Sequence, residues 1–89
     1  MVSIDLVVKN QVGLHARPAT LFVMEAKKYL SAVFLDFNGQ RVNAKSPLEI
    51  MGLGIRSGSE ITITADGNDE TAAVEGLKNL VESNFGEPA

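Results

Sequence analysis

The side chains with the most distinctive chemistry lie within one short stretch of the chain, from Gly13 to Ala19. His15 is the only histidine, and Arg17 follows it two residues later. Imidazole is available as an uncharged nitrogen nucleophile near neutral pH, because its free pKa lies at about 6.5. A guanidinium group binds phosphate oxygens in bidentate geometry. This combination indicates reversible capture of a phosphoryl group.

The same stretch carries the signals of a helix start. Pro18 fits a first helical turn, where the N–H group that proline lacks would be unpaired in any case. The positive end of the helix dipole and Arg17 both favour the uncharged imidazole of His15. After transfer, first-turn N–H groups and Arg17 would stabilise the phosphate dianion. The helix is expected over about residues 16–28, with a core face of Ala19, Phe22, Val23 and Ala26.

Other roles for a lone histidine are a helix cap, half-buried filler, a metal ligand or part of a hydrolase. Gly13 frees the backbone before His15, and Arg17 supplies a phosphate partner after it, which weakens the first two. One histidine and no cysteine provide too few ligands for a metal site. No nucleophile elbow is present. We therefore expect no metal and no cofactor.

The elements around this stretch are read from hydrophobic periodicity. Four strands are expected, over residues 2–8, 32–37, 40–44 and 61–65. Two more helices are expected, one opening at Ser46 and one capped by Asn68 and ended by Gly86 and Pro88. Asn38-Gly39 is typical of a two-residue hairpin turn. The order βαββαβα indicates an α+β fold with helices on one face of an antiparallel sheet.

Length and composition narrow the protein class. With 89 residues, the chain is expected to form one domain over residues 1–89. The absence of cysteine fits a reducing cytoplasm. No apolar run is long enough to span a bilayer, and no signal-peptide pattern opens the chain. The net charge of −3 argues against bulk nucleic-acid binding. We expect a cytoplasmic location.

An apolar surface is predicted next to His15. It combines side chains of the first helix with two from the short helix, and methionine suits a surface that accepts several partners. The alternative is that Leu21 and Met24 are only the edge of the core. Lys45 is expected to be solvated. The predicted docking surface comprises Thr20, Leu21, Met24, Lys27, Leu48 and Met51.

Ser46 has two compatible interpretations. It can cap the short helix, with Pro47 at the first helical position and Glu49 completing a capping box. It can also be a phosphorylation site, which would add about −1.5 to −2 charge at that helix start. Neither role excludes the other.

At this point the whole chain resembles HPr, the histidine-containing phosphocarrier family of the bacterial phosphotransferase system. The motifs that carry the resemblance are Gly13-Leu14-His15-Ala16-Arg17-Pro18-Ala19, Asn38-Gly39, Val42-Asn43-Ala44-Lys45-Ser46, and Met51-Gly52-Leu53-Gly54-Ile55 followed by Gly58.

The resemblance implies an open-faced β-sandwich, with a four-stranded antiparallel sheet covered on one face by three helices. It also implies that Enzyme I, charged from phosphoenolpyruvate, phosphorylates His15 on Nδ1, and that enzyme II A domains receive the phosphoryl group during sugar uptake. Arg17 would be the phosphate partner. Positions used for partner docking are matched by Thr20, Leu21, Met24, Leu48 and Met51. The protein would be a monomeric carrier and not an enzyme.

Ser46 matches the regulatory serine of many family members, where a serine kinase/phosphorylase links it to a catabolite-control transcription factor. Pro47 and Leu48 depart from the usual aliphatic residue and methionine at these positions, and Glu49 would repel a phosphate on Ser46. The alternatives are a nitrogen-branch phosphocarrier paralogue and a catabolite-control cofactor that acts through phosphorylated Ser46. A ligand-binding α+β regulatory domain is disfavoured, because no second polar cluster lines an obvious pocket.

Overall fold

Four strands form one antiparallel sheet in the computed structural model, which describes residues 1–87. Pro88, expected to end the last helix, lies outside the described residues, as does Ala89. The sheet has the spatial order β1-β4-β2-β3, so β1 and β3 are its edges. The strands are β1 (Val2–Val7), β2 (Ala32–Phe37), β3 (Gln40–Asn43) and β4 (Glu60–Asp66). The strand predicted over residues 40–44 thus ends one residue early.

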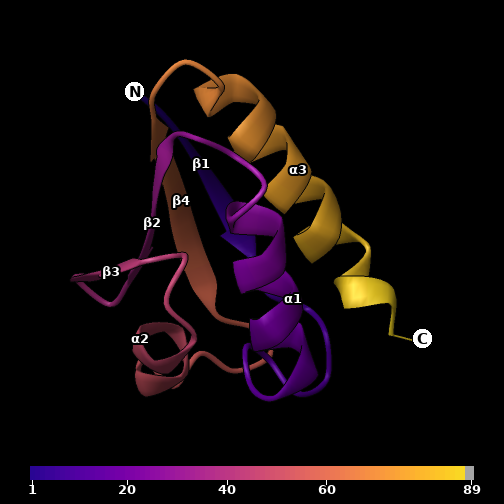
Figure 1. Ribbon diagram of the computed structural model, residues 1–89. Coiled ribbons are helices and arrows are strands. Elements are labelled where there is room, and N and C mark those ends of the chain that lie inside the picture. Colours follow the sequence, from indigo (N-terminus) through magenta and orange to yellow (C-terminus); the bar gives the residue numbers. More distant parts are fainter. Residues whose placement is uncertain (88–89) are drawn as a thin grey trace.

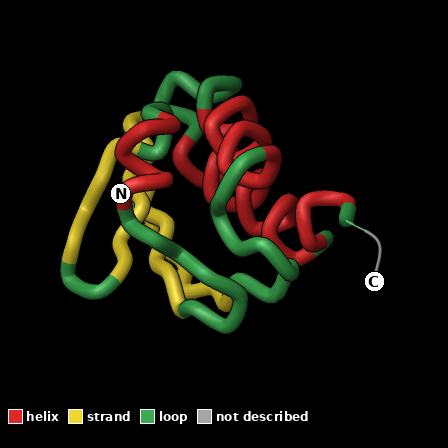
Figure 2. Tube along the Cα trace, turned by 90° about the horizontal axis from the view of Figure 1, so that it is seen from below, coloured by secondary structure: helices red, strands yellow, loops and turns green. Residues whose placement is uncertain are grey.

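Two longer helices lie side by side over one face of the sheet (Figure 1). They are α1 (Arg17–Ala26) and α3 (Glu70–Glu82). The short α2 (Pro47–Gly52) packs against α1 and β3, and a single 3-10 turn, η1 (Asn84–Gly86), follows α3. Figure 2 shows the strands gathered on one side of the molecule and the longer helices on the other. The predicted open-faced sandwich is confirmed.

The hydrophobic core lies between the sheet and the two longer helices. The alternation predicted for the first strand is confirmed, because Leu6 and Val8 are buried while Asp5 and Val7 are exposed. The four predicted core positions of α1 are also buried. Burying an aliphatic or aromatic side chain of this kind stabilises the fold by about 1.5–3 kcal/mol. This packing fixes α1 over the sheet and so fixes its N-terminal end, where the functional stretch begins.

Local turn chemistry agrees with the sequence at the hairpin and differs from it at the start of α3. Asn38 and Gly39 have φ of 53° and 79°, as the hairpin requires. The N-cap of α3 is Asp69, and Asn68, predicted to be the cap, is not. The Asp69 side chain makes no capping bond to its own helix. Its carboxylate instead accepts hydrogen bonds from the N–H groups of Leu30 and Ser31 and from the Ser31 hydroxyl.

The capping box predicted at α2 is only half formed. The Ser46 hydroxyl accepts a long hydrogen bond of 3.4 Å from the Glu49 N–H. The reciprocal bond is absent among the described residues, since the Glu49 carboxylate accepts from the N–H of Asn43 instead. Lys45, expected to be solvated, is half-buried, and its Nζ donates to the carbonyls of Tyr29 and Ser31 at 2.8 and 2.9 Å. It therefore ties the start of α2 to the α1–β2 loop.

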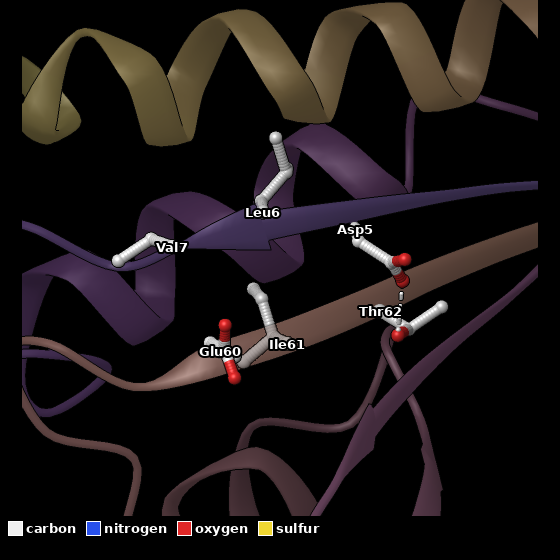
Figure 3. A pocket seen from close by; sticks show the side chains of 6 residues that line it. All are labelled: Asp5, Leu6, Val7, Glu60, Ile61 and Thr62. Carbon is white, nitrogen blue, oxygen red and sulfur yellow. Dashed lines mark hydrogen bonds between the residues drawn. The ribbon is translucent and has the colours of Figure 1, made fainter.

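The face of the sheet opposite the helices is polar. A shallow hollow of about 350 Å³ lies between β1 and β4 on this side, where the Thr62 hydroxyl donates to Asp5 at 2.7 Å (Figure 3). The hydroxyls of Ser3 and Thr64 share a hydrogen bond nearby. None of the residues that line this hollow belongs to the stretch around His15. No helix within residues 1–87 is long and apolar enough to cross a membrane.

Candidate functional site

His15 has an exposed side chain on a backbone that is anchored just before it. Leu14 is fully buried, and its N–H donates to the Ile55 carbonyl at 3.1 Å. The first helical residue of α1 is Arg17, so His15 lies two residues before the helix proper. Figure 1 shows this loop, α2 and η1 at the same end of the molecule. The imidazole is thus accessible, and the main chain that carries it is anchored by a core residue.

Gly13 is required by the close approach of two loops. Its φ is +67°, and a Cβ there would lie 2.4 Å from the Ile55 carbonyl oxygen and 2.8 Å from Arg56 Cα. Backbone atoms cannot move aside cheaply, so no other residue fits without displacing the 53–58 segment. The segment before His15 is therefore held against the loop that leads into β4.

Ala16 carries the most unusual backbone conformation of the site. It is the N-cap of α1, with φ of 53° and ψ of −125°. A non-glycine residue in such a region costs on the order of 1–3 kcal/mol and persists only where the surrounding structure imposes it. The Ala16 carbonyl accepts hydrogen bonds from the Thr20 N–H and hydroxyl. The helix predicted to start at residue 16 thus starts one residue later, with the strained residue directly after His15.

Arg17 is exposed at the first position of α1. It borders a surface depression of about 300 Å³ together with Pro18, Leu21 and the segment 85–87. None of the carboxylates among residues 1–87 forms an ion pair with Arg17. The first N–H groups of a helix have no acceptor within the helix. The geometry therefore presents a nucleophilic nitrogen, a guanidinium group and unpaired N–H donors at one helix start.

The six predicted docking residues are spread over α1, the turn that follows it and α2, two helices that contact each other. Three of them are large apolar side chains with high exposure, at 58% for Met24, 81% for Leu48 and 38% for Met51. Thr20 and Lys27 are exposed, whereas Leu21 is half-buried and packs against the core. The arrangement is an apolar surface beside the exposed histidine, and its role in docking stays a prediction.

Ser46 lies at the start of α2 and is half-buried. Pro47 occupies the first turn after it, as the sequence indicated. Within residues 1–87, no three histidine, aspartate or glutamate side chains are grouped as metal ligands. Asn10, which the sequence placed only in a loop, is buried beside Gly13 and makes contacts that sequence reasoning missed.

Comparisons with known proteins show what this chain is similar to. The family described as the PTS HPr component phosphorylation site matches residues 2–83. The HPr-like protein Crh of Halalkalibacterium halodurans is 48% identical over 82 residues, which cover 92% of this chain and 98% of that protein.

Two solved structures are informative. HPr-C-His from Thermoanaerobacter tengcongensis superposes with a TM-score of 0.98 at 43% identity, over the whole of both chains. Crh from Bacillus subtilis, described as a catabolite repression protein and a domain-swapped dimer, gives a TM-score of 0.75 at 44% identity, covering 94% of this chain and 97% of that one.

Proposed function

Since this chain belongs to the HPr family of phosphocarriers, we propose that His15 accepts a phosphoryl group from phosphorylated Enzyme I and passes it to enzyme II A domains during sugar uptake. The observation that carries the proposal is the exposed imidazole of His15 on a fixed backbone, next to Arg17 and the start of α1. In this role the chain is a cytoplasmic carrier and not an enzyme, because its product is its own phosphorylated side chain.

Transfer of the phosphoryl group to His15 is a single nucleophilic displacement at the phosphorus atom. Nδ1 of the uncharged imidazole attacks, a P–N bond forms on His15, and the electron pair of the broken bond stays on the donor. Arg17 and the first-turn N–H groups offset the charge of the new phosphate. Transfer to an acceptor reverses the same step, so the carrier requires stabilisation that is sufficient for capture without preventing release.

We propose that Thr20, Leu21, Met24, Lys27, Leu48 and Met51 form the surface on which these partners dock. Exposed methionine and leucine side chains at 38–81% exposure support this, since isolated soluble domains seldom group large apolar side chains beside a charged site. Flexible methionine side chains also adapt to more than one partner.

Labelling by Enzyme I and phosphoenolpyruvate tests the proposal directly. The expected product is a phosphoprotein of increased intact mass that is labile in acid and stable in base. His15→Ala should abolish it. Arg17→Lys keeps the charge but loses bidentate geometry, and should lower the labelling rate by about tenfold. Equal labelling of His15→Ala and the parent protein would refute the assignment.

Phosphoramidate is a small phosphoryl donor that needs no protein partner. It therefore tests the reactivity of His15 separately from recognition by Enzyme I. Its P–N bond breaks with release of ammonia as the imidazole is phosphorylated. Labelling of His15 by phosphoramidate but not by Enzyme I would keep the carrier chemistry and reject the sugar-branch donor, which is the outcome expected of a nitrogen-branch paralogue.

A second candidate function is catabolite control through phosphorylation of Ser46, favoured by the description of the Bacillus subtilis relative as a catabolite repression protein. The Ser46 hydroxyl accepts only a long hydrogen bond of 3.4 Å from the Glu49 N–H. Phosphorylation of Ser46 would therefore disrupt only one weak interaction. Treatment with the serine kinase/phosphorylase and ATP should add one phosphate to the parent and none to Ser46→Ala. No ATP-dependent adduct would remove this function, and with it the transcription-factor partner.

A further inference from the structure

Asn10 is a buried polar residue in the loop that joins β1 to α1. Only 2% of its surface is exposed. Its Nδ2 donates to the Gly13 carbonyl at 2.9 Å and to Glu87 Oε2 at 3.1 Å, and its main-chain carbonyl accepts from the Gly13 N–H at 3.4 Å. Asn10 therefore closes the loop on Gly13, two residues before His15.

Glu87 comes from the far end of the chain and reaches this loop through an unusual backbone. Asn84, Phe85 and Gly86 have φ of 54°, 56° and 73°, three consecutive left-handed residues. Two of them are not glycine, so the bend is strained and must be imposed by packing. Buried Phe85 supplies that packing. The segment after α3 thereby lies beside the start of α1, where Phe85, Gly86 and Glu87 line a depression together with Arg17 and Pro18.

A side-chain amide that donates to a single acceptor can rotate about its last bond, and then the Gly13 carbonyl loses its partner. A second acceptor on the same nitrogen fixes the amide plane. Glu87 Oε2 provides this second acceptor. Segment 85–87 also lines the depression that Arg17 borders, so the same residues adjoin both halves of the acceptor site.

We propose that Asn10 and Glu87 form a clasp that positions the His15 stretch for phosphoryl acceptance, an inference that rests on the proposed function. Neither residue touches the reacting atoms. Asn10 holds Gly13, Gly13 and Leu14 hold the backbone on the Ile55 carbonyl, and His15 follows. Glu87 acts through Asn10 as a hydrogen-bond acceptor and not through its charge.

The test compares four single variants and the double variant of Asn10→Ala with Glu87→Ala. Asn10→Ala removes the donor and Glu87→Ala removes the acceptor, whereas Glu87→Gln keeps an acceptor oxygen and loses the charge. Glu75→Ala is the matched control, because Glu75 is an exposed glutamate on α3 outside the site. The readouts are initial labelling rates at varied carrier concentration and the amide hydrogen exchange of Leu14 and His15.

Asn10→Ala and Glu87→Ala should each lower the maximal rate by about 2- to 10-fold, the range expected for one hydrogen bond, with KM unchanged because the docking surface is intact. Glu87→Gln and Glu75→Ala should match the parent. The double variant should be no slower than Asn10→Ala alone, since the two residues act as one unit. Exchange at Leu14 and His15 should quicken in the same variants.

Rates and exchange in Glu87→Ala that equal those of Glu75→Ala would overturn the clasp, and this variant lies outside the core, so it does not depend on the folding of Asn10→Ala. A slow Glu87→Gln would instead assign Glu87 an electrostatic role and refute positioning. Hydrogen exchange needs no phosphoryl donor. Failure of the parent to label therefore refutes the proposed function, whereas unchanged exchange refutes the clasp.

Discussion

At the scale of single residues, Gly13 and Gly54 offer a matched pair. Both have φ near +67°, but a Cβ on Gly13 would meet the Ile55 carbonyl, whereas a Cβ on Gly54 would meet nothing within 4 Å. Alanine at either position carries the backbone penalty of the left-handed region, about 1 kcal/mol. Only alanine at position 13 also has to displace a neighbouring backbone.

We predict that Gly13→Ala lowers the free energy of unfolding by roughly 3 kcal/mol, against about 1 kcal/mol for Gly54→Ala. Urea denaturation of both variants measures the two values. The difference isolates the clash with Ile55 from the strain of positive φ. An equal decrease in the free energy of unfolding in the two variants would mean that the 53–58 segment moves without cost, contrary to the packing described.

Tyr29 gives a residue-scale prediction about pH, and it is the only tyrosine in the chain. Its hydroxyl donates to Glu25 at 2.7 Å, and this hydrogen bond is the main reason that the pKa of Tyr29 is raised to about 12. A folded-state pKa above the unfolded value of about 10 stabilises the fold fully below pH 10. This contribution is lost as the pH rises from 10 towards 12.

Titration by tyrosinate absorbance should therefore show a midpoint well above that of free tyrosine in the folded protein. Glu25→Gln should move the midpoint down towards 10, because the charged acceptor is gone. An unchanged midpoint in this variant would show that Glu25 is not the cause.

Residue-scale chemistry was predictable where it is local. His15, Arg17 and Pro18 are adjacent in sequence, so their types alone indicated phosphoryl capture and a helix start. The strain at Ala16 and the contacts of Asn10 were not predictable. No local pattern marked Ala16 for a positive φ, and none encodes a hydrogen bond between residues 10 and 87.

At the scale of elements, the N-terminal end of α3 shows how a tertiary contact overrides a local signal. Asn68 is a good N-cap residue by type, yet the cap is Asp69, whose carboxylate is bonded to the α1–β2 loop. These bonds, first from the Ser31 hydroxyl and then from the N–H groups of Leu30 and Ser31, lower the pKa of Asp69. The helix start is thus anchored to the start of β2.

We predict that Asp69→Asn lowers Tm by several degrees at neutral pH, whereas Asn68→Ala leaves it nearly unchanged. Because the folded-state pKa of Asp69 lies below its unfolded value, the stabilisation is complete above about pH 4 and is lost as the pH falls through the folded pKa. The gap in Tm between parent and Asp69→Asn should close in that acidic range. A larger effect of Asn68→Ala would restore the sequence-based assignment.

The order of elements and their buried faces followed from periodicity, since Leu6, Val8 and the four core positions of α1 are where alternation and helical spacing put them. Helix ends were less predictable. Glu49 was expected to complete a capping box, but it bonds to Asn43 because β3 ends within reach of its carboxylate. Lys45 was likewise expected in solvent, because the sequence does not show that its Nζ reaches the carbonyl of Tyr29.

At the scale of the whole molecule, the question is whether the chain stays monomeric. A swapped dimer, as described for Crh of Bacillus subtilis, exchanges an element between two copies. Release of β1 in this chain would break its pairing with β4 and remove Leu6 and Val8 from the core. It would also need the loop after β1 to straighten, and Asn10 and Gly13 hold that loop bent.

We therefore predict a monomer in solution, with a mass close to 9.5 kDa by light scattering after size-exclusion chromatography. Asn10→Ala should raise any dimer fraction that appears on concentration, because its loop is freed. Glu75→Ala provides the reference. A parent protein that elutes as a stable dimer at low concentration would contradict the prediction.

The positions of the two ends of the chain have a practical consequence for attaching labels. The Met1 amine lies near Glu70 and Asp66, and the amino terminus lies at the opposite end of the molecule from the start of α1 (Figure 1). A reporter protein or purification tag fused before Met1 would cost only exposed ion pairs, which are worth little. The same tag fused after residue 89 would follow closely on Glu87, which lines the depression that Arg17 borders. Biosensors and immobilised forms of this protein should therefore be built through the amino terminus.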